Sequence, residues 1–170
     1  MAIADIKLLV FDVDGVLTDG RLYFSARGEE LKAFNARDGA GIKCLMRAGV
    51  ECAFLSGRES AVAAARAAEL GVKHVVGGAK DKLPALRELL AELGLAPAQA
   101  AFVGDDQVDL PAMRECGWSA CPADAVREVR EAADYVAALP GGRGAAREII
   151  EHLLKEQGRW PAILARYRPE

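Results

Sequence analysis

Cysteine and histidine are scarce in this chain of 170 residues, and neither type is spaced like a set of metal ligands. The four cysteines form no CxxC pair, and the two histidines, His74 and His152, are isolated. This pattern disfavours a zinc site. It favours buried free thiols of the kind found in a reducing cytosol.

Basic residues are not in excess, because 22 lysines and arginines stand against 25 aspartates and glutamates, for a formal net charge of −3. A nucleic-acid-binding surface normally appears as a basic excess, so we expect no nucleic-acid partner. No apolar run approaches the length of a membrane span, and the residues before the first apolar run are too few for a signal peptide. We therefore expect a cytoplasmic chain with no membrane partner.

The sequence also has no internal repeat, low-complexity tract or linker. Its composition, 52% hydrophobic and 28% charged, is that of a globular protein. A chain of this length can bury a hydrophobic core without disulfides or metals. We expect residues 1–170 to form a single domain.

Short apolar runs alternate with helical patterns along most of the chain. Leu8-Leu9-Val10-Phe11 is apolar at every position, which is typical of a strand buried on both faces. Further strands are predicted at 50–55, 74–76, 100–103, 118–120 and 135–136, and helices at 38–47, 59–70, 82–93, 110–116 and 125–132 and around 146–154. The alternation predicts an α/β fold with a doubly wound, mostly parallel, Rossmann-like sheet. Asp38 is expected to cap the first helix, and the tail at 158–170 to pack elsewhere or to be mobile.

The segment at residues 21–34 departs from this alternation. Two stretches with aromatic and aliphatic residues, 22–24 and 30–34, flank a turn that contains Gly28, which predicts a projecting β-hairpin. An isolated two-stranded hairpin is only marginally stable, so its apolar side chains need cover. We expect another subunit to provide that cover, with packing against the chain's own body as the alternative.

Two aspartates, Asp12 and Asp14, stand at the carboxyl end of the first predicted strand. Open α/β sheets bind ligands in the crevice at this end of their strands. Gly15 allows the chain to turn there, so that both carboxylates can serve one site. An EF-hand loop also begins with alternating acids, but Tyr23 then occupies the position of its bidentate glutamate, which excludes that interpretation.

Polar residues follow other predicted strands as well. Ser56 follows the strand at 50–55 and is expected at the start of a helix, and Asp105 follows the strand at 100–103 within Gly104-Asp105-Asp106. Lys82 opens the helix at 82–93. Because the carboxyl ends of parallel strands share one edge of the sheet, we expect these side chains to converge.

This set of groups suits the transfer of a phosphoryl group. Asp12 and Asp105 could supply the carboxylates that Mg²⁺ prefers beside phosphate oxygens and water. A carboxylate nucleophile gives an aspartyl-phosphate, and Asp14 could protonate the leaving alkoxide and then activate water. Ser56 and Lys82 could stabilise the phosphoryl oxygens. The ordinary alternatives are a helix cap for Ser56 and a solvated helix residue for Lys82.

Asp12-x-Asp14, Ser56, Lys82 and Gly104-Asp105-Asp106-x-x-Asp109 resemble the four motifs of the haloacid dehalogenase superfamily of phosphatases. Three further stretches narrow the likeness to its family of 3-deoxy-D-manno-octulosonate 8-phosphate phosphatases. They are Phe34-Asn35-Ala36-Arg37-Asp38-Gly39, Ser56-Gly57-Arg58 and Gly141-Gly142-Arg143-Gly144-Ala145. The resemblance covers about residues 6–158.

The resemblance implies a Mg²⁺-dependent phosphatase of the lipopolysaccharide pathway. Asp12 would be the nucleophile and a metal ligand, Asp14 the acid/base and a metal ligand through its backbone carbonyl, and Asp105 a further metal ligand. Asp109 would support these residues. Ser56 and Lys82 complete the expected catalytic set.

Larger members of the superfamily carry a cap domain, for which the gaps between the motifs leave no room here. A neighbouring subunit would then have to supply selectivity, and the resemblance implies a homotetramer. It also implies contacts to the sugar acid phosphate from Asp14, Asn35, Ala36, Arg37, Asp38, Gly39, Lys43, Arg58, Arg66 and Lys82, some of them across a subunit boundary. Arg58 and Arg66 are predicted to share one helix ridge, and for each basic residue a solvated surface charge is the alternative.

Three other functions compete with this one. A signalling receiver domain would have paired acids at the first strand and its phospho-acceptor on a middle strand, an order that this chain does not follow. A phosphatase acting on a nine-carbon sugar acid phosphate is closer, and Arg58 favours the eight-carbon substrate. A non-catalytic tetramerisation module, related to domains of sugar-nucleotide synthetases, is disfavoured by the intact Asp12, Asp14, Lys82 and Asp105.

Overall fold

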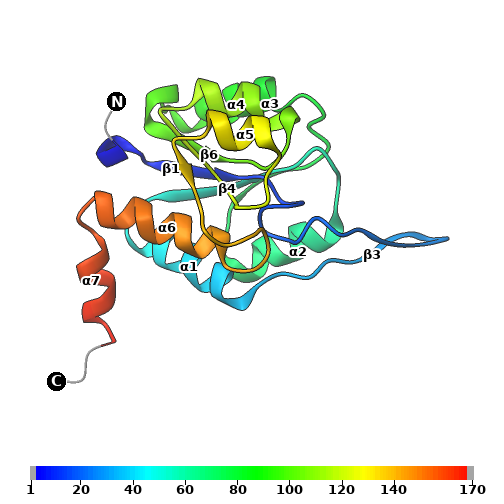
Figure 1. Ribbon diagram of the computed structural model, residues 1–170, viewed down its shortest axis with the longest axis horizontal. Helices are drawn as coiled ribbons and strands as arrows, with labels where there is room; N and C mark the ends of the chain where they lie inside the picture. The colour runs from blue at the N-terminus through cyan, green and yellow to red at the C-terminus, as the bar shows by residue number, and fades with distance from the viewer. Residues whose placement is uncertain (1–2, 168–170) are drawn as a thin grey trace.

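The computed structural model describes residues 3–167, with Glu29 and Glu30 described by their backbone only. Its centre is a six-stranded sheet in the order β5-β4-β1-β6-β7-β8, in which every neighbouring pair is parallel. Figure 1 shows this sheet between two layers of helices. The strands are β1 (Leu8–Phe11), β4 (Glu51–Leu55), β5 (His74–Val76), β6 (Ala100–Val103), β7 (Trp118–Cys121) and β8 (Tyr135–Val136). The chain winds outward from β1 to β5, then returns to the other side of β1 and continues to β8. This arrangement confirms the predicted doubly wound α/β fold.

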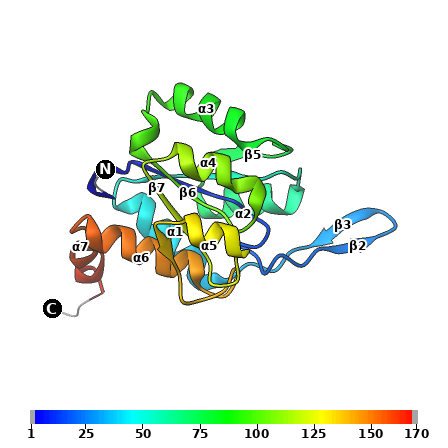
Figure 2. The same ribbon diagram turned by 45° about the horizontal axis from the view of Figure 1, so that its top comes forward.

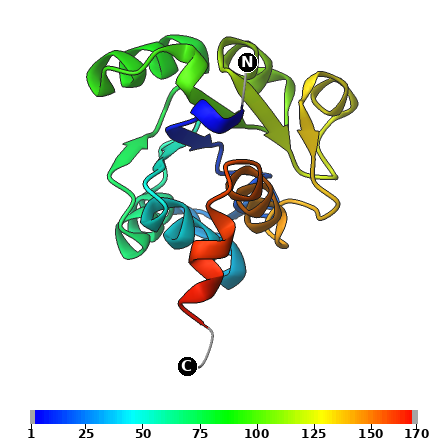
Figure 3. The same ribbon diagram turned by 90° about the vertical axis from the view of Figure 1, so that its left-hand side faces the viewer.

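Helices cover both faces of the sheet (Figure 3). α1 (Ala36–Arg47), α2 (Ala61–Leu70) and α6 (Ala145–Glu156) pack on one face, and α3 (Lys82–Leu93), α4 (Leu110–Glu115) and α5 (Arg127–Ala132) pack on the other. Within β1, Leu9 and Phe11 join the first core, whereas Leu8 and Val10 join the second. The central strand is therefore apolar at every position because both of its faces are buried.

The predicted hairpin is confirmed as β2 (Tyr23–Ser25) and β3 (Gly28–Leu31), an antiparallel pair separate from the main sheet. It projects from the body of the chain (Figure 2). Tyr23, Phe24 and Leu31 are 48%, 58% and 64% exposed. The alternative in which the chain's own body covers these apolar side chains is therefore wrong.

The prediction that Asp38 caps α1 is also wrong. The helix begins two residues earlier than predicted, and the side chain of its N-cap Asn35 accepts a hydrogen bond from the Arg37 amide. Asp38 instead accepts hydrogen bonds from the amides of Gly144 and Arg147 at the start of α6, at 3.3 and 2.8 Å. The first turn of α6 has free amides that a carboxylate can satisfy. Asp38 thereby fastens α1 to α6, a long-range pairing that a local pattern does not contain.

The start of α2 needs a second correction. Ser60, rather than a residue near Ser56, is the N-cap, and its hydroxyl accepts a hydrogen bond from the Ala63 amide. Ser56 and Arg58 therefore lie in the loop between β4 and α2. Arg58 and Arg66 do not share a helix ridge, because only Arg66 is helical.

The C-terminal tail packs against the body as far as the structure describes it. A short helix, α7 (Trp160–Ala165), buries Trp160 and Ile163 in the same core as α1 and α6. Residues 168–170 of the predicted tail lie outside the described part of the chain. Three short 3₁₀ turns, at Ile3–Asp5, Pro97–Gln99 and Gln107–Asp109, complete the elements. Among the described residues, no helix combines the length and apolar character needed to cross a bilayer.

Candidate active site

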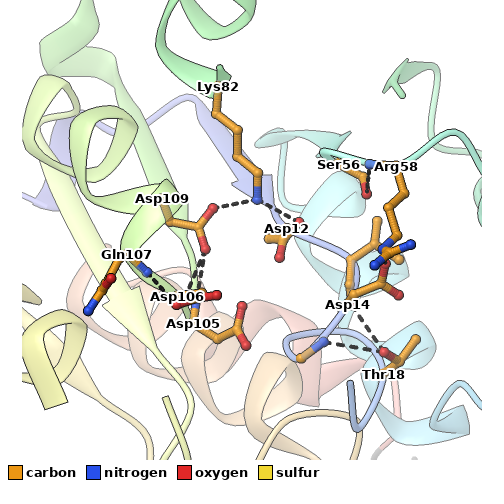
Figure 4. A network of polar contacts seen from close by, with 12 residues as sticks. Asp12, Asp14, Thr18, Ser56, Arg58, Lys82, Asp105, Asp106, Gln107 and Asp109 are labelled. Carbon is orange, nitrogen blue, oxygen red and sulfur yellow. Dashed lines mark hydrogen bonds and ion pairs between the residues drawn. The ribbon is translucent and has the colours of Figure 1, made fainter. Parts of the chain in front are cut away.

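A cavity of about 620 Å³ opens at the carboxyl ends of β1, β4 and β6. β1 lies between β4 and β6, so residues that follow the three strands face one another. The catalytic residues expected from the sequence all line this cavity, together with the expected metal ligand Asp105 and the expected substrate contact Arg58. They are Asp12, Asp14, Ser56, Arg58, Lys82 and Asp105. The predicted convergence at one edge of the sheet is confirmed (Figure 4).

Lys82, the first residue of α3, lies between two carboxylates. Its Nζ is 2.8 Å from Asp12 Oδ1 and 2.5 Å from Asp109 Oδ1, and all three side chains are at least nine-tenths buried. Burial alone would lower the pKa of Lys82, but Asp12 and Asp109 together raise it above its ordinary value. Lys82 is thus held as a fixed cation beside Asp12, and it is not a solvated helix residue.

Asp109 has both carboxylate oxygens engaged. Oδ1 accepts from Lys82, and Oδ2 accepts from the backbone amides of Asp105 and Asp106 at 3.0 and 3.2 Å (Figure 4). Gly104 has no Cβ, which would lie 2.4 Å from the Cβ of Asp109. Asp109 therefore fixes the loop after β6 and the lysine, as expected of a supporting residue.

The loop after β1 is shaped by Thr18, a residue that the sequence reasoning missed. Its buried hydroxyl accepts hydrogen bonds from the amides of Gly15 and Gly20 and donates one to the Val13 carbonyl. Gly15 has a φ of +93°, and a Cβ there would lie 2.0 Å from Asp105 Oδ2. A glycine at this position therefore permits the turn and also leaves room for the Asp105 carboxylate.

Three carboxylates meet in this part of the cavity. Asp12, Asp105 and Asp109 each offer a ligand oxygen, and these oxygens lie within 4.8 Å of one another. Burial raises the pKa of Asp12 to about 6 despite the opposing effect of Lys82. Burial, with Asp12 and Asp109 nearby, raises the pKa of Asp105 to about 8. One lysine does not balance these buried acids, so the site fits a hard divalent cation such as Mg²⁺.

Asp14 is held by a residue that the sequence reasoning also missed. Lys32, just after β3, forms an ion pair with Asp14 Oδ1, and its side chain is only 1% exposed. Arg58 Nε lies 3.9 Å from Asp14 Oδ2. A lysine next to a hairpin strand gives no local signal that its side chain reaches an acid eighteen positions earlier.

Ser56 is buried at the end of β4, where its backbone pairs with Val76 and Ala79. Its Oγ accepts a hydrogen bond from the Arg58 amide at 3.2 Å, which leaves the hydroxyl proton available to a ligand in the cavity. The helix-cap alternative for Ser56 is wrong, because α2 starts further along the chain.

The remaining expected sugar contacts lie away from this cavity within one chain. Asn35, Asp38, Gly39 and Arg66 line a separate small cavity of about 10 Å³. The Arg66 guanidinium donates to the Asn35 carbonyl and fills the space beside Gly39. A groove beside α6 is lined by Arg37, and another beside α2 by Ala36, whereas Lys43 is partly buried on α1. Substrate contact by these residues stays a prediction.

Gly15→Ala is expected to weaken metal binding by at least tenfold, because the added methyl group displaces the Asp105 carboxylate. Backbone strain at positive φ should also cost about 1–2 kcal/mol of stability. The matched control is Gly49→Ala, which has a similar φ of +82° and open space around its Cβ position. Calorimetric titration with Mg²⁺ should show weakened binding for Gly15→Ala alone. Equal affinities in both variants would contradict this role for Gly15.

Metal binding should strengthen as the pH rises from about 6 to about 8, since protons compete for Asp12 and Asp105. Their folded pKa values lie above the ordinary 3.8, so the metal-free folded chain binds more protons than the unfolded chain. Its stability therefore falls as pH rises through this window. The Mg²⁺-induced increase in Tm should be larger at pH 8 than at pH 6. An increase of the same size at both would show that these acids do not bind the ion.

Known proteins were compared with this fold and site. The family model of haloacid dehalogenase-like hydrolases matches residues 27–117. The chain belongs to this family of hydrolases. Among its relatives is the 3-deoxy-D-manno-octulosonate 8-phosphate phosphatase of Escherichia coli K12, 46% identical over 91% of this chain and 82% of that protein.

Solved structures that are similar to this chain include phosphatases of the same kind. A probable phosphatase from Pseudomonas syringae has a TM-score of 0.95 and 48% identity, covering 99% of this chain and 96% of that one. The 3-deoxy-D-manno-octulosonate 8-phosphate phosphatase of Moraxella catarrhalis, solved with magnesium, phosphate and the sugar acid, has a TM-score of 0.94. It is 39% identical and covers 98% of this chain and 95% of that one.

Proposed function

We propose that this chain is a Mg²⁺-dependent phosphatase that hydrolyses 3-deoxy-D-manno-octulosonate 8-phosphate to the free sugar acid and phosphate. The observation that carries the proposal is the meeting of Asp12, Asp14, Lys82 and Asp105 in one cavity at the end of β1. The order of the acids along the chain disfavours a receiver domain, and a silent scaffold has no need to keep a buried lysine between two buried acids. The similar phosphatases supply the identity of the substrate.

In the first step, a carboxylate oxygen of Asp12 attacks phosphorus, and the bond from phosphorus to the sugar oxygen breaks. Asp14 gives its proton to the departing alkoxide, which leaves as the alcohol. Lys82 places a cation beside Asp12, and the Ser56 hydroxyl can donate to a phosphoryl oxygen, so both offset charge in the transition state. The product is an aspartyl-phosphate on Asp12.

In the second step, water attacks the phosphorus of the aspartyl-phosphate. Asp14, now ionised, accepts a proton from that water, and the bond from phosphorus to the Asp12 oxygen breaks. Phosphate is released, and Asp12 and Asp14 return to their starting states. One pair of carboxylates thus carries both displacements.

The carboxylates of Asp12 and Asp105, with the backbone carbonyl of Asp14, are the groups proposed to hold Mg²⁺. When bound, the ion supplies positive charge that reduces the repulsion between the Asp12 carboxylate and a phosphate dianion. Asp109 stays outside this set, because its oxygens are engaged with Lys82 and two backbone amides.

The chain is proposed to work as a single domain without a cap, in a homotetramer in the cytoplasm, in lipopolysaccharide synthesis. Between β1 and β4 the chain adds only the hairpin and α1, so the cavity opens to solvent. The exposed hairpin offers Tyr23, Phe24 and Leu31 to a second copy. Such a copy would also bring in the basic residues that one chain keeps away from the cavity.

Phe24→Ser is expected to lower the oligomeric state, because Phe24 is 58% exposed on the hairpin and its apolar ring would be buried between copies. Sedimentation equilibrium of the full chain should give a tetramer for the wild type and smaller species for the variant. Leu164→Ser, which alters an exposed apolar side chain on α7, is the matched control. A monomeric wild-type chain would exclude the proposed assembly.

The function is tested by phosphate release, with and without Mg²⁺, from eight- and nine-carbon sugar acid phosphates and simple monoesters. The highest kcat/KM is expected for the eight-carbon ester, and no activity without the metal. A preference for the nine-carbon ester would transfer the proposal to that substrate. Absence of hydrolysis from every ester would leave a non-catalytic module.

A further inference from the structure

The base of the hairpin reaches the active site through one buried side chain. Lys32 follows β3 directly, and its ammonium forms an ion pair with Asp14 Oδ1 although the neighbouring Leu31 is 64% exposed. The Lys32 side chain is 1% exposed, so its charge has left water almost completely. Desolvating a lysine is costly unless a carboxylate compensates, and here that carboxylate belongs to the proposed acid/base.

The two oxygens of Asp14 differ in their surroundings. Oδ1 is held by Lys32, whereas Oδ2 is buried and accepts no hydrogen bond from the residues that the structure describes. The Arg58 guanidinium lies near Oδ2, with Nε at 3.9 Å, beyond hydrogen-bond distance. Asp14 lines the catalytic cavity and Oδ1 is engaged by Lys32, so Oδ2 is the oxygen left for proton exchange once the exposed Arg58 side chain beside it moves to admit a ligand.

We propose that Lys32 is a positioning residue for the reaction: it fixes Asp14 by one oxygen and so keeps the other oxygen for proton exchange with the leaving group. This inference rests on the proposed function, because it needs Asp14 to act as acid and base. Proton transfer depends on placing the donor within about 3 Å of the accepting atom. A carboxylate that turns freely about its side-chain bonds spends only part of its time in that geometry.

The position of Lys32 also gives the hairpin a role beyond association. Gly20 and Leu22, which lead into β2, line the cavity, and Lys32, which leaves β3, contacts Asp14. Both ends of the hairpin thus meet the site, while its turn points away from the body (Figure 2). The same segment that would contact another copy therefore sets the orientation of the acid/base.

The test uses the leaving group, because only a poor leaving group needs an acid. Lys32→Met in the full chain should lower kcat/KM for the sugar acid phosphate by about 10- to 100-fold, part of the ~10²–10⁴ that a positioned acid contributes. For p-nitrophenyl phosphate, whose phenolate leaves without a proton, kcat/KM should fall by less than about threefold. The ratio kcat/KM reports formation of the aspartyl-phosphate only, so later steps do not affect the comparison.

Three variants separate positioning from general damage. Lys73→Met makes the same substitution at an exposed lysine between α2 and β5, and it should leave kcat/KM unchanged for both substrates. Lys32→Arg keeps the cation and should restore part of the loss for the sugar ester. In an Asp14→Asn background, Lys32→Met should add little further loss, because its effect passes through Asp14.

Equal losses for the two esters, or full additivity with Asp14→Asn, would overturn the role of Lys32 and leave it as a structural anchor of the hairpin. A different result would contradict the proposed function. A wild-type chain that releases phosphate from neither ester would contradict the phosphatase activity itself.

Discussion

Asp12→Asn is expected to abolish phosphate release, with kcat lowered by ~10⁴-fold or more, as for other nucleophiles whose removal blocks a covalent step. An amide has no anionic oxygen with which to attack phosphorus, and it cannot form the aspartyl-phosphate. The folded chain should persist, since burial already raises the pKa of Asp12 and makes its charge unfavourable there. The measurement is Mg²⁺-dependent release of phosphate from the sugar acid phosphate, with Tm recorded in parallel.

Asp5→Asn is the matched control, because it makes the same substitution at an exposed aspartate before β1. It should leave both kcat and Tm unchanged. If Asp12→Asn retained more than about a tenth of the wild-type rate with its fold intact, another group would have to attack phosphorus.

Lys82→Met is expected to have the largest effect on stability. Removing the cation leaves Asp12 and Asp109 buried together without a positive charge between them, and breaking such an ion pair costs about 3–5 kcal/mol. Lys82 stays protonated throughout the range from pH 5 to pH 8, because its pKa is raised above the ordinary 10.5. The pH dependence of the loss therefore comes from Asp12, whose pKa is raised to about 6 beside Lys82 and would rise further without it.

The loss in unfolding free energy should be largest near pH 8, where Asp12 is charged, and smaller near pH 5, where a proton neutralises Asp12. Urea unfolding of metal-free wild type and variant at the two pH values measures this difference. Mg²⁺ should recover part of the stability of the variant, whereas Lys7→Met, at an exposed site, should behave as wild type. A pH-independent loss would mean that the methionine disturbs packing and not charge.

The sheet and its catalytic edge could be predicted because their signals are local. Strands buried on both faces are apolar throughout, and β6 and α3 were predicted with the bounds that the structure gives. Asp12, Ser56 and Asp105 each follow such a strand, and parallel topology alone brings strand ends together. The cluster could therefore be inferred without any knowledge of contacts.

The rest depends on tertiary contacts between groups that have several possible partners. Asp38 could cap its own helix, but it binds the amides of α6 more than a hundred residues later. Lys32 and Thr18 resemble ordinary hairpin and loop residues, and their roles appear only once the chain has folded around Asp14 and Gly15. The placement of Asn35, Arg37 and Arg66 likewise follows from how α1 packs within one chain, which spacing does not reveal.

The central claim is that phosphorus passes through a covalent bond to Asp12 at the carboxyl end of β1. The stereochemical course at phosphorus tests it most directly, with a substrate phosphoryl group made chiral by sulfur and oxygen isotopes and hydrolysed in isotopically labelled water. Two successive in-line displacements, first by Asp12 and then by water, give net retention of configuration. Inversion would mean that water attacks the sugar ester directly, and the acids would then have no nucleophile among them.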